Sequence, residues 1–420
     1  MTSLIIDQMF HPVGNGTFKS GYVFSPKESN AFTWVYDCGS TSMTSLNRIF
    51  GYITKSGWPS SIDMLVLSHF DNDHVNGVET LLRHCHVKSL VLPFSEWVQS
   101  VREISVLGKK GTSPSTALLQ LNPLEWLSSR DFDVRVDEVI FIQGGSDIPP
   151  VPFSDETPDS ELSDSQREEN LNYFRENYFF HGTAFSGSTE IRTLKHNRSI
   201  QAVNGDFEFA FFNAEKDIAA LGLIVECSGK WYAKRSGWLL SDVKADIQKT
   251  IQSINLHQPL AVMPSNWRKI LKGRYEYHFG HSGKAKNNIS LCMYAGPVNS
   301  KITHFRVGSP PYISRHIPKL SERVATLCTG DIHLTPSVIT DMQNHFGSVR
   351  WNTIGLVQVP HHGSQHSWEV GNAALLAPAQ FVQCASGSKH HPHPIVQADL
   401  SKYVVHTADR TQSVHIRYVV

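Results

Sequence analysis

Four short apolar runs in this chain each end in histidine or aspartate residues. The densest such end follows Met64–Leu67 and reads Ser-His-Phe-Asp-Asn-Asp-His over residues 68–74. Two carboxylates and two imidazoles crowded at a strand end must lose water or repel one another unless a cation lies between them. The pattern therefore predicts a metal site, and the other three runs have to supply its remaining ligands.

Composition excludes several classes of protein. The chain has 420 residues, enough for one large α/β domain or two smaller ones, and its 38 basic and 38 acidic residues leave no net charge. A dedicated nucleic-acid binder would be basic overall, although a local basic groove stays compatible with neutrality. The six cysteines lie far apart with no C-x-x-C pair, which favours buried thiols in a reducing compartment over disulfides or a thiolate zinc site.

The N-terminus lacks the basic and apolar regions of a signal peptide, and no apolar run approaches the roughly 20 residues that span a bilayer. We therefore expect a cytoplasmic protein with no membrane association.

The order of apolar and polar segments predicts an α/β fold. β-rich runs at 3–10, 21–25 and 31–40 suggest antiparallel strands, followed by a helix at 42–55, a strand at 64–67, a helix from Gly77 and a strand at 88–93. Residues 111–130 look helical, and the acidic stretch 154–178 is expected to be a solvated loop or a helix-bearing insertion. Strands return at 207–214 and in the final third, whereas 228–285 looks irregular.

The first polar cluster has two interpretations. In an extended loop, residues two apart point the same way, so His69 and Asp71 could bind one ion while Asp73 and His74 reach a second. Mixed imidazole and carboxylate ligands suit Zn²⁺, Mn²⁺ or Fe better than Ca²⁺. The alternative is a polar turn whose side chains satisfy backbone groups before a helix.

Three later motifs favour the metal site. Asp331 ends an apolar strand in CTGDIH, where it can bridge two ions or cap a helix. His361 and His362 follow another strand in VPHHGS, with Gly363 permitting a tight turn, and can act as ligand and general acid. The last motif offers His390, His391 and His393, and the sequence does not decide which of them points inward.

In this order, SHFDNDHVNG, CTGDIH, VPHHGS and HPHP resemble the metallo-β-lactamase fold, and within it the soluble hydrolase domains of ComEC-type DNA-uptake proteins. The glycine loop HPVGNG, the D-x-G of WVYDCGS and the strand NNISLCM agree with this group. The resemblance covers roughly 1–95 and 285–420. It implies one αββα sandwich over residues 1–420, with insertions at about 100–205 and 215–285.

The resemblance also implies roles for single residues. Asp37 is similar to a buried carboxylate that orients a ligand histidine. The implied metal ligands are His69, Asp71, Asp73, His74, Asp331 as the bridge, and His391, with His393 as its competitor. Asp73, His361 and His362 are the implied catalytic residues, either histidine standing where related phosphodiesterases, including the RNase Z group, protonate the leaving oxygen.

Two departures from the wider fold concern the metal. Asp71 replaces the second histidine of H-x-H-x-D-H, and the usual histidine before T-G-D is missing, with Asn287 or Asn288 near its place. Harder ligands imply one or two exchangeable divalent ions, Zn²⁺ or Mn²⁺.

The resemblance implies a metal-dependent hydrolase, and the HHGS motif favours a phosphodiesterase or nuclease acting on a nucleic acid or nucleotide. Basic and aromatic residues at 267–286 suit phosphates and bases, although a solvated basic loop explains them equally well. One alternative is a hydrolase of small esters, lactones or amides on the same fold. The other is an effector with low basal activity that a regulatory protein partner activates.

Overall fold

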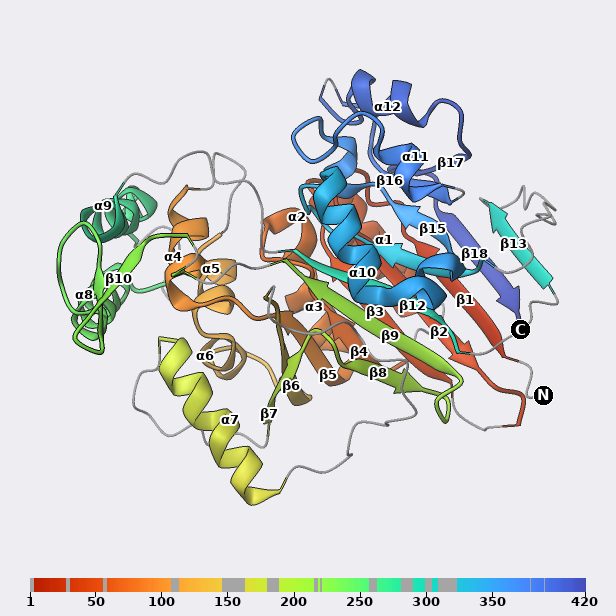
Figure 1. Cartoon of the computed structure of the whole chain (residues 1–420). Helices are drawn as coiled ribbons and strands as arrows, with labels where there is room; N and C mark the ends of the chain where they lie inside the picture. Colours follow the sequence, from red (N-terminus) through yellow and green to blue (C-terminus); the bar gives the residue numbers. More distant parts are fainter. Residues whose placement is uncertain are drawn as a thin grey trace.

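The computed structural model describes residues 4–27, 31–55, 59–106, 113–145, 163–179, 189–214, 218–219, 221–256, 263–280, 290–298, 304–308, 323–377, 379–388 and 390–420. Two β-sheets stack face to face, and helices cover their outer faces (Figure 1). The order of strands is β13-β18-β1-β2-β3-β4-β5-β6-β7 in the larger sheet and β17-β16-β15-β14-β12-β9-β8 in the smaller one.

The strands have the following bounds: β1 (Ile5–Phe10), β2 (Phe18–Phe24), β3 (Phe32–Cys38), β4 (Ser61–Val66), β5 (His86–Pro93), β6 (Val136–Gln143), β7 (Glu190–Lys195), β8 (Ser199–Ala202), β9 (Phe207–Asn213), β10 (Ile224–Cys227), β11 (Lys230–Ala233), β12 (Leu291–Pro297), β13 (His304–Gly308), β14 (Ala325–Cys328), β15 (Ile354–Gln358), β16 (Gln380–Cys384), β17 (Val405–Ala408) and β18 (Val414–Val419). The helices are α1 (Met43–Lys55), α2 (Asn72–Val75), α3 (Val78–His84), α4 (Trp97–Val106), α5 (Pro114–Leu121), α6 (Pro123–Ser128), α7 (Asp164–Asn177), α8 (Leu240–Ile254), α9 (Trp267–Phe279), α10 (Pro336–Thr353), α11 (Asn372–Leu376) and α12 (Pro394–Leu400), with a 3₁₀ turn at Pro360–Gly363.

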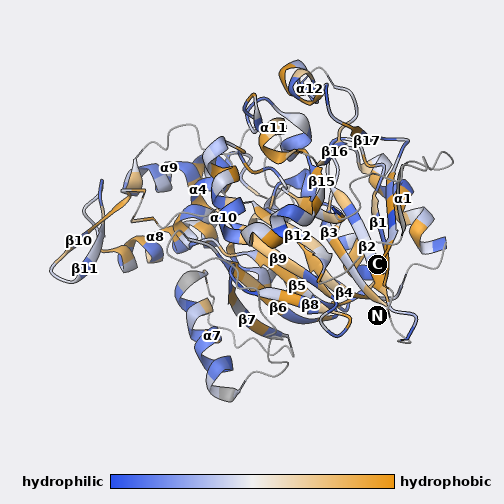
Figure 2. Cartoon of the chain, turned by 45° about the vertical axis from the view of Figure 1, so that its right-hand side comes forward, coloured by the Kyte–Doolittle hydropathy of each residue, from blue (hydrophilic) through white to orange (hydrophobic). Residues whose placement is uncertain are grey.

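Strand β9 illustrates how the sequence produces two packed layers. All seven of its residues are buried, and successive side chains point to opposite faces of the sheet. Phe207, Phe209 and Phe211 enter the core between the sheets, whereas Ala210 and Phe212 pack under the outer helices. Hydrophobic residues accordingly dominate the strands of both sheets, whereas α7 is largely hydrophilic (Figure 2).

Parallel pairing brings the metal motifs to common sheet edges. Strands β3 to β7 are parallel neighbours in one sheet, and β14 to β17 in the other. Carboxyl ends of parallel strands meet at one edge, where α/β proteins place their sites. The motifs follow β3, β4, β14, β15 and β16, so they collect at these edges.

Most of the predicted elements are present. The expected helix at 42–55 is α1, the strand at 64–67 belongs to β4, and the first three strands pair antiparallel as predicted. The helical stretch 111–130 forms two helices, because Asn122 ends α5 and its side chain caps α6 by accepting from the Glu125 amide. The αββα layering predicted from the motifs is therefore the observed layering.

The middle of the chain is more ordered than its sequence suggests. Within 100–205, strands β6 and β7 belong to the larger sheet and β8 belongs to the smaller one. Helix α7 is exposed and acidic, and a capping box at Ser163 begins it. The rest of the acidic stretch before residue 163 lies outside the described residues.

The expectation of irregular structure at 228–285 is wrong for its described part. Strand β11 pairs with β10 there, and α8 and α9 follow. Helix α8 buries Val243, Ile247, Ile251 and Ile254, an i, i+4 spacing that the surrounding Gly, Trp and His residues obscured. These four elements extend from the sandwich beside α4 (Figure 1).

Within the described part of the chain, no helix has both the length and the apolar character needed to cross a membrane.

Candidate metal centre

Asp37 supports the loop that carries His69 and His74. It is fully buried at the end of β3 in the left-handed conformation (φ 56°). Its carboxylate accepts from the Ser68 amide at 2.6 Å, the Ser68 hydroxyl at 2.7 Å and His74 Nδ1 at 2.8 Å. This is the supporting role that the resemblance implied for Asp37.

Glycines allow the loops around the cluster to touch. A Cβ on Gly39 would lie 2.4 Å from the carbonyl carbon of Asp73, so the D-x-G turn lies directly against the DNDH backbone. Gly330 has φ 55°, and a Cβ there would lie 2.3 Å from Ser290 Oγ and 2.8 Å from Ser68 Cβ. Only glycine permits these approaches, which bring the loops after β3, β4 and β14 together.

Hydrogen bonds determine which ring nitrogen of each histidine carries the proton. His74 Nδ1 must donate to Asp37, because an ionised carboxylate only accepts. The Ser68 hydroxyl donates to Asp37, so its oxygen accepts a hydrogen bond from His69 Nδ1 at 2.9 Å. Both rings therefore present an Nε2 lone pair to the centre, the arrangement typical of metal-binding histidines.

The tandem histidines after β15 follow the same rule. His362 Nδ1 donates to the Cys384 carbonyl at 2.9 Å, leaving its Nε2 3.2 Å from Asp73 Oδ2. His361 Nδ1 contacts Ser367 Oγ at 3.1 Å, and the Ser367 hydroxyl proton points to the Asp331 carbonyl. Both residues have left-handed backbone conformations (φ 48° and 55°), and this conformation directs both rings towards the site. It costs on the order of 1 kcal/mol of backbone strain per residue.

Asp331 stands between these groups. Its Oδ1 lies 3.0 Å from His74 Nε2, and neither atom has a hydrogen-bond partner within the described residues. Its Oδ2 lies 3.7 Å from His69 Nε2 and 3.6 Å from His361 Nε2. The two carboxylate oxygens thus face different sets of nitrogens.

The last histidine motif separates into three environments. His391 stacks on His361 with ring centroids 5.6 Å apart. His393 caps α12, where its Nδ1 accepts from the Ile395 amide, and His390 is exposed. His391 is thus the one of the three whose ring lies against the site histidines, although it joins neither compact donor group described below.

The donors meet the geometry of a metal site. Two groups of donor atoms, His69, His74 and Asp331, and Asp73, His74 and His362, each lie within 4.8 Å of one another. Asp71 adds another donor atom, because its Oδ2 lies 3.8 Å from His69 Nε2. Ligands of one tetrahedral ion with bonds of about 2.1 Å lie about 3.4 Å apart, close to the observed separations.

The electrostatics of these groups suit a bound cation. In the neutral rings the Nε2 lone pairs of His69, His74 and His361 face carboxylate oxygens, a repulsive contact unless a proton or metal ion lies between them. His362 Nε2 lies within hydrogen-bond distance of Asp73 Oδ2. Burial lowers the pKa of His69 to about 3, and burial together with Asp73 and Asp331 raises the pKa of Asp71 well above its usual range. Burial alone would lower the pKa of His74, but Asp331 and Asp37 outweigh it and hold this pKa well above its ordinary value. A divalent cation would relieve these contacts with every carboxylate ionised and every imidazole neutral.

The sequence did not reveal several residues around the centre. Ser68 and Ser367 fix the proton positions. Glu103 on α4 interacts electrostatically with Asp71, and burial raises the pKa of Glu103 to about 7. Serines carry no signal for this role, and Glu103 lies in a helix far along the chain. His333 lies away from the donor groups and contacts the His366 carbonyl, and the predicted Asn287 or Asn288 lies outside the described residues.

Comparisons with known proteins concern the fold. No protein-family model matches the sequence, and no curated protein does. Among solved structures, the chain is similar to a long form RNase Z from yeast (9% identity, TM-score 0.34), over 90% of this chain and 36% of that one. It is also similar to unliganded yeast PDE1 (6% identity, TM-score 0.37, 100% of both chains) and to MEM-A1, a subclass B3 metallo-beta-lactamase isolated from a soil metagenome library (12% identity, TM-score 0.20, 64% of this chain and 92% of that one).

The αββα layering that the sequence predicts is the layering of this chain, and its assignment to the metallo-β-lactamase type stays a prediction. At these identities and TM-scores the likeness says nothing of substrate or site, and a specific kinship with ComEC-type domains stays a prediction.

Proposed function

We propose that the protein is a metal-dependent hydrolase that cleaves phosphodiester bonds. The observation that carries this proposal is the convergence of four imidazole Nε2 atoms on the carboxylates of Asp331 and Asp73, with each Nδ1 hydrogen-bonded to an oxygen. A divalent cation would make these lone pairs and carboxylates compatible without protonating any of them.

The donor sets suggest how two ions would be divided. His69, Asp71 and Asp331 Oδ2 would hold the first ion. Asp73, His74, His362 and Asp331 Oδ1 would hold the second, because the single Nε2 lone pair of His74 faces Oδ1. This division gives His362 the place that the resemblance assigned to His391, and makes Asp331 the bridge. Divalent ions held there would supply Lewis-acid activation of a water molecule and of a substrate oxygen.

His361 is the best-placed proton donor for the leaving oxygen. Its side chain is 32% exposed, whereas that of His362 is 4% exposed and faces Asp73. A substrate can therefore reach His361, whereas His362 is held by the Asp73 carboxylate. Ser367 fixes the orientation of the His361 ring.

A phosphodiester suits the surroundings better than a neutral ester or amide. The Arg268 guanidinium is half-buried at the start of α9, and its charge interacts with that of Asp71. A cation whose charge acts on a ligand carboxylate favours an anionic substrate, because it offsets the charge that a phosphoryl group brings.

Turnover of bis(p-nitrophenyl) phosphate with Mn²⁺ or Zn²⁺ tests the proposal, with bound metal measured on the same samples. We expect activity in the wild type, its loss together with bound metal in Asp73→Ala, and its retention in His333→Ala, a histidine outside the donor groups. A wild type that binds metal and cleaves p-nitrophenyl esters but no phosphodiester would refute the phosphodiesterase assignment.

A further inference from the structure

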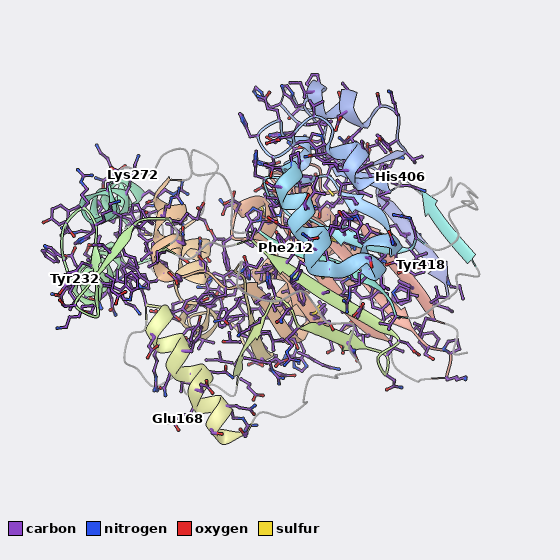
Figure 3. The ribbon with its side chains drawn as sticks, viewed as in Figure 1. Glu168, Phe212, Tyr232, Lys272, His406 and Tyr418 are labelled. Carbon is purple, nitrogen blue, oxygen red and sulfur yellow. The ribbon has the colours of Figure 1, made fainter. Side chains whose placement is uncertain are left out.

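Charge is unevenly distributed over this neutral chain. The unit formed by β10, β11, α8 and α9, called the arm here, spans residues 221–256 and 263–280 and carries nine Lys and Arg residues against four Asp and Glu residues. Lys272 on α9 and Tyr232 on β11 lie at the end of the molecule where the arm extends from the sandwich (Figure 3). The arm is thus a local positive region on a protein without net charge.

Helix α9 has one buried and one open side. Its apolar side, Trp267, Leu271, Tyr275 and Phe279, is buried in the core that also contains α4 and α8 residues. The opposite side carries Lys269, Ile270, Lys272, Arg274 and Tyr277, which we call the α9 face. A Cβ on Gly273, in the middle of this face, would meet no atom within 4 Å, so the face is unobstructed among the described residues.

Aromatic rings lie among the cations of the α9 face. Tyr277 is 50% exposed and meets the 42% exposed Trp238 edge to face, with centroids 6.2 Å apart at 89°. The Arg274 guanidinium lies 5.9 Å from the Tyr277 ring. Two carboxylates contact the face: Asp246 Oδ2 lies 3.1 Å from Arg274 Nε, and Glu276 Oε1 lies 3.6 Å from Lys272 Nζ. Exposed rings between cations offer stacking surfaces and phosphate contacts together.

The start of α9 is close enough to Asp71 for their charges to interact. Arg268, half-buried in the first turn of α9, interacts electrostatically with Asp71. Helix α9 also packs against α4, whose Glu103 interacts electrostatically with the same carboxylate. At about 1.5 Å per residue, the 13 residues of α9 give the face a length of about 20 Å.

We propose that the α9 face binds single-stranded nucleic acid as the substrate of the metal centre. Charge complementarity selects a polyanion, and the exposed Tyr277 and Trp238 rings select unpaired bases, whose faces are open for stacking. A duplex offers only its backbone to such rings. The inference names the substrate class of the proposed phosphodiesterase and rests on it in that respect.

Fluorescence anisotropy of a labelled oligothymidylate, measured in EDTA so that no hydrolysis occurs, tests the inference. We expect binding that weakens with salt and is tighter than for a duplex of equal length. The double variant Lys269→Ala/Lys272→Ala should bind about tenfold more weakly and lower the slope of log K against log salt by about 1.4, or about 0.7 per lost phosphate contact. Tyr277→Ala should also cost about tenfold, with less change in that slope.

Lys249→Ala is the matched control, because Lys249 is an exposed cation on α8, turned away from that helix's buried side. We expect its affinity to equal that of the wild type. Equal affinity of the α9-face variants and the wild type would overturn the inference, as would duplex binding as tight as single-strand binding. No oligonucleotide binding at low salt would also overturn it and make a protein the better occupant of this face.

The binding assay separates this inference from the proposed function. Turnover of bis(p-nitrophenyl) phosphate without oligonucleotide binding would refute the inference alone. Oligonucleotide binding that the α9-face variants lose, in a protein without phosphodiesterase turnover, would refute the proposed function and leave the nucleic-acid site in place.

Discussion

Replacing Asp37 by asparagine should weaken metal binding without emptying the space that the side chain fills. Asp37 is fully buried and accepts three hydrogen bonds, one at Oδ1 and two at Oδ2. An asparagine amide offers one acceptor and one donor atom, so it cannot reproduce this pattern in either orientation.

Each orientation of the amide has a distinct cost. With its NH₂ at the Oδ1 position, it meets the Ser68 amide donor and leaves a buried N–H unsatisfied, at about 1–3 kcal/mol of unfolding free energy. With its NH₂ at the Oδ2 position, His74 Nδ1 must accept instead, which moves the ring proton to Nε2 and removes the lone pair that faces Asp331. Loss of such a supporting carboxylate typically lowers metal affinity by about 10- to 100-fold.

Competition with a chromophoric chelator measures the metal affinity, and urea unfolding in EDTA measures the stability. Asp63→Asn is the matched control, because Asp63 Oδ2 also accepts two hydrogen bonds, from the Thr33 amide and hydroxyl, away from the donor groups. Both variants should lose stability, but only Asp37→Asn should lose metal affinity. Wild-type zinc and manganese affinity in Asp37→Asn would show that His74 does not use Nε2 as a ligand.

Three further predictions follow from single groups. His393→Ala should lower the unfolding free energy by about 1 kcal/mol through loss of the α12 cap, with bound metal unchanged; a loss of metal would place His393 among the ligands. Metal at about 100 times its Kd should add about 2.7 kcal/mol to the unfolding free energy of the wild type, but not of Asp331→Ala, by calorimetry with and without EDTA.

Third, burial lowers the pKa of His11 to about 3 in the folded protein. On acidification, His11 therefore binds a proton at a higher pH in the unfolded chain than in the folded one. Stability should therefore fall as pH drops from about 6.5 towards 3, by up to about 1.4 kcal/mol per pH unit from this residue. Urea unfolding in EDTA should show a shallower slope in His11→Gln, and equal slopes would refute the assignment.

The sequence was informative where chemistry and strand order coincide. The loops after β4, β14, β15 and β16 each follow an apolar strand, so ligand types could be read next to the strand that positions them. Parallel pairing then brings loops distant in sequence to one edge, as the motifs predicted. The layering of two sheets between helices followed from the same reasoning.

Side-chain direction was not readable in the same way. Whether His362 or His391 faces Asp73 depends on two consecutive left-handed residues and on the Cys384 carbonyl, which is a backbone atom of a neighbouring strand. The sequence motif H-H-G signals a tight turn but not which ring the turn aims inward. The proton positions on the rings depend on Ser68 and Ser367, residues that no motif distinguishes from other serines.

The net charge of the whole chain does not describe the charge on any one face of the protein. Residues 154–178 contain eight acidic and two basic residues, which nearly cancel the excess of cations on the arm. Salt screens exposed charges beyond about 8–10 Å. A bound strand therefore interacts with the charges of the nearest face and not with the net charge of the whole chain. Lys244 on α8 contacts the carbonyl oxygens of Arg175 and Glu176, so the acidic helix α7 ends at the base of the basic arm. The neutral composition therefore includes a local excess of cations on the arm, and the salt dependence of oligonucleotide binding should follow the residues of the α9 face rather than the net charge of the chain.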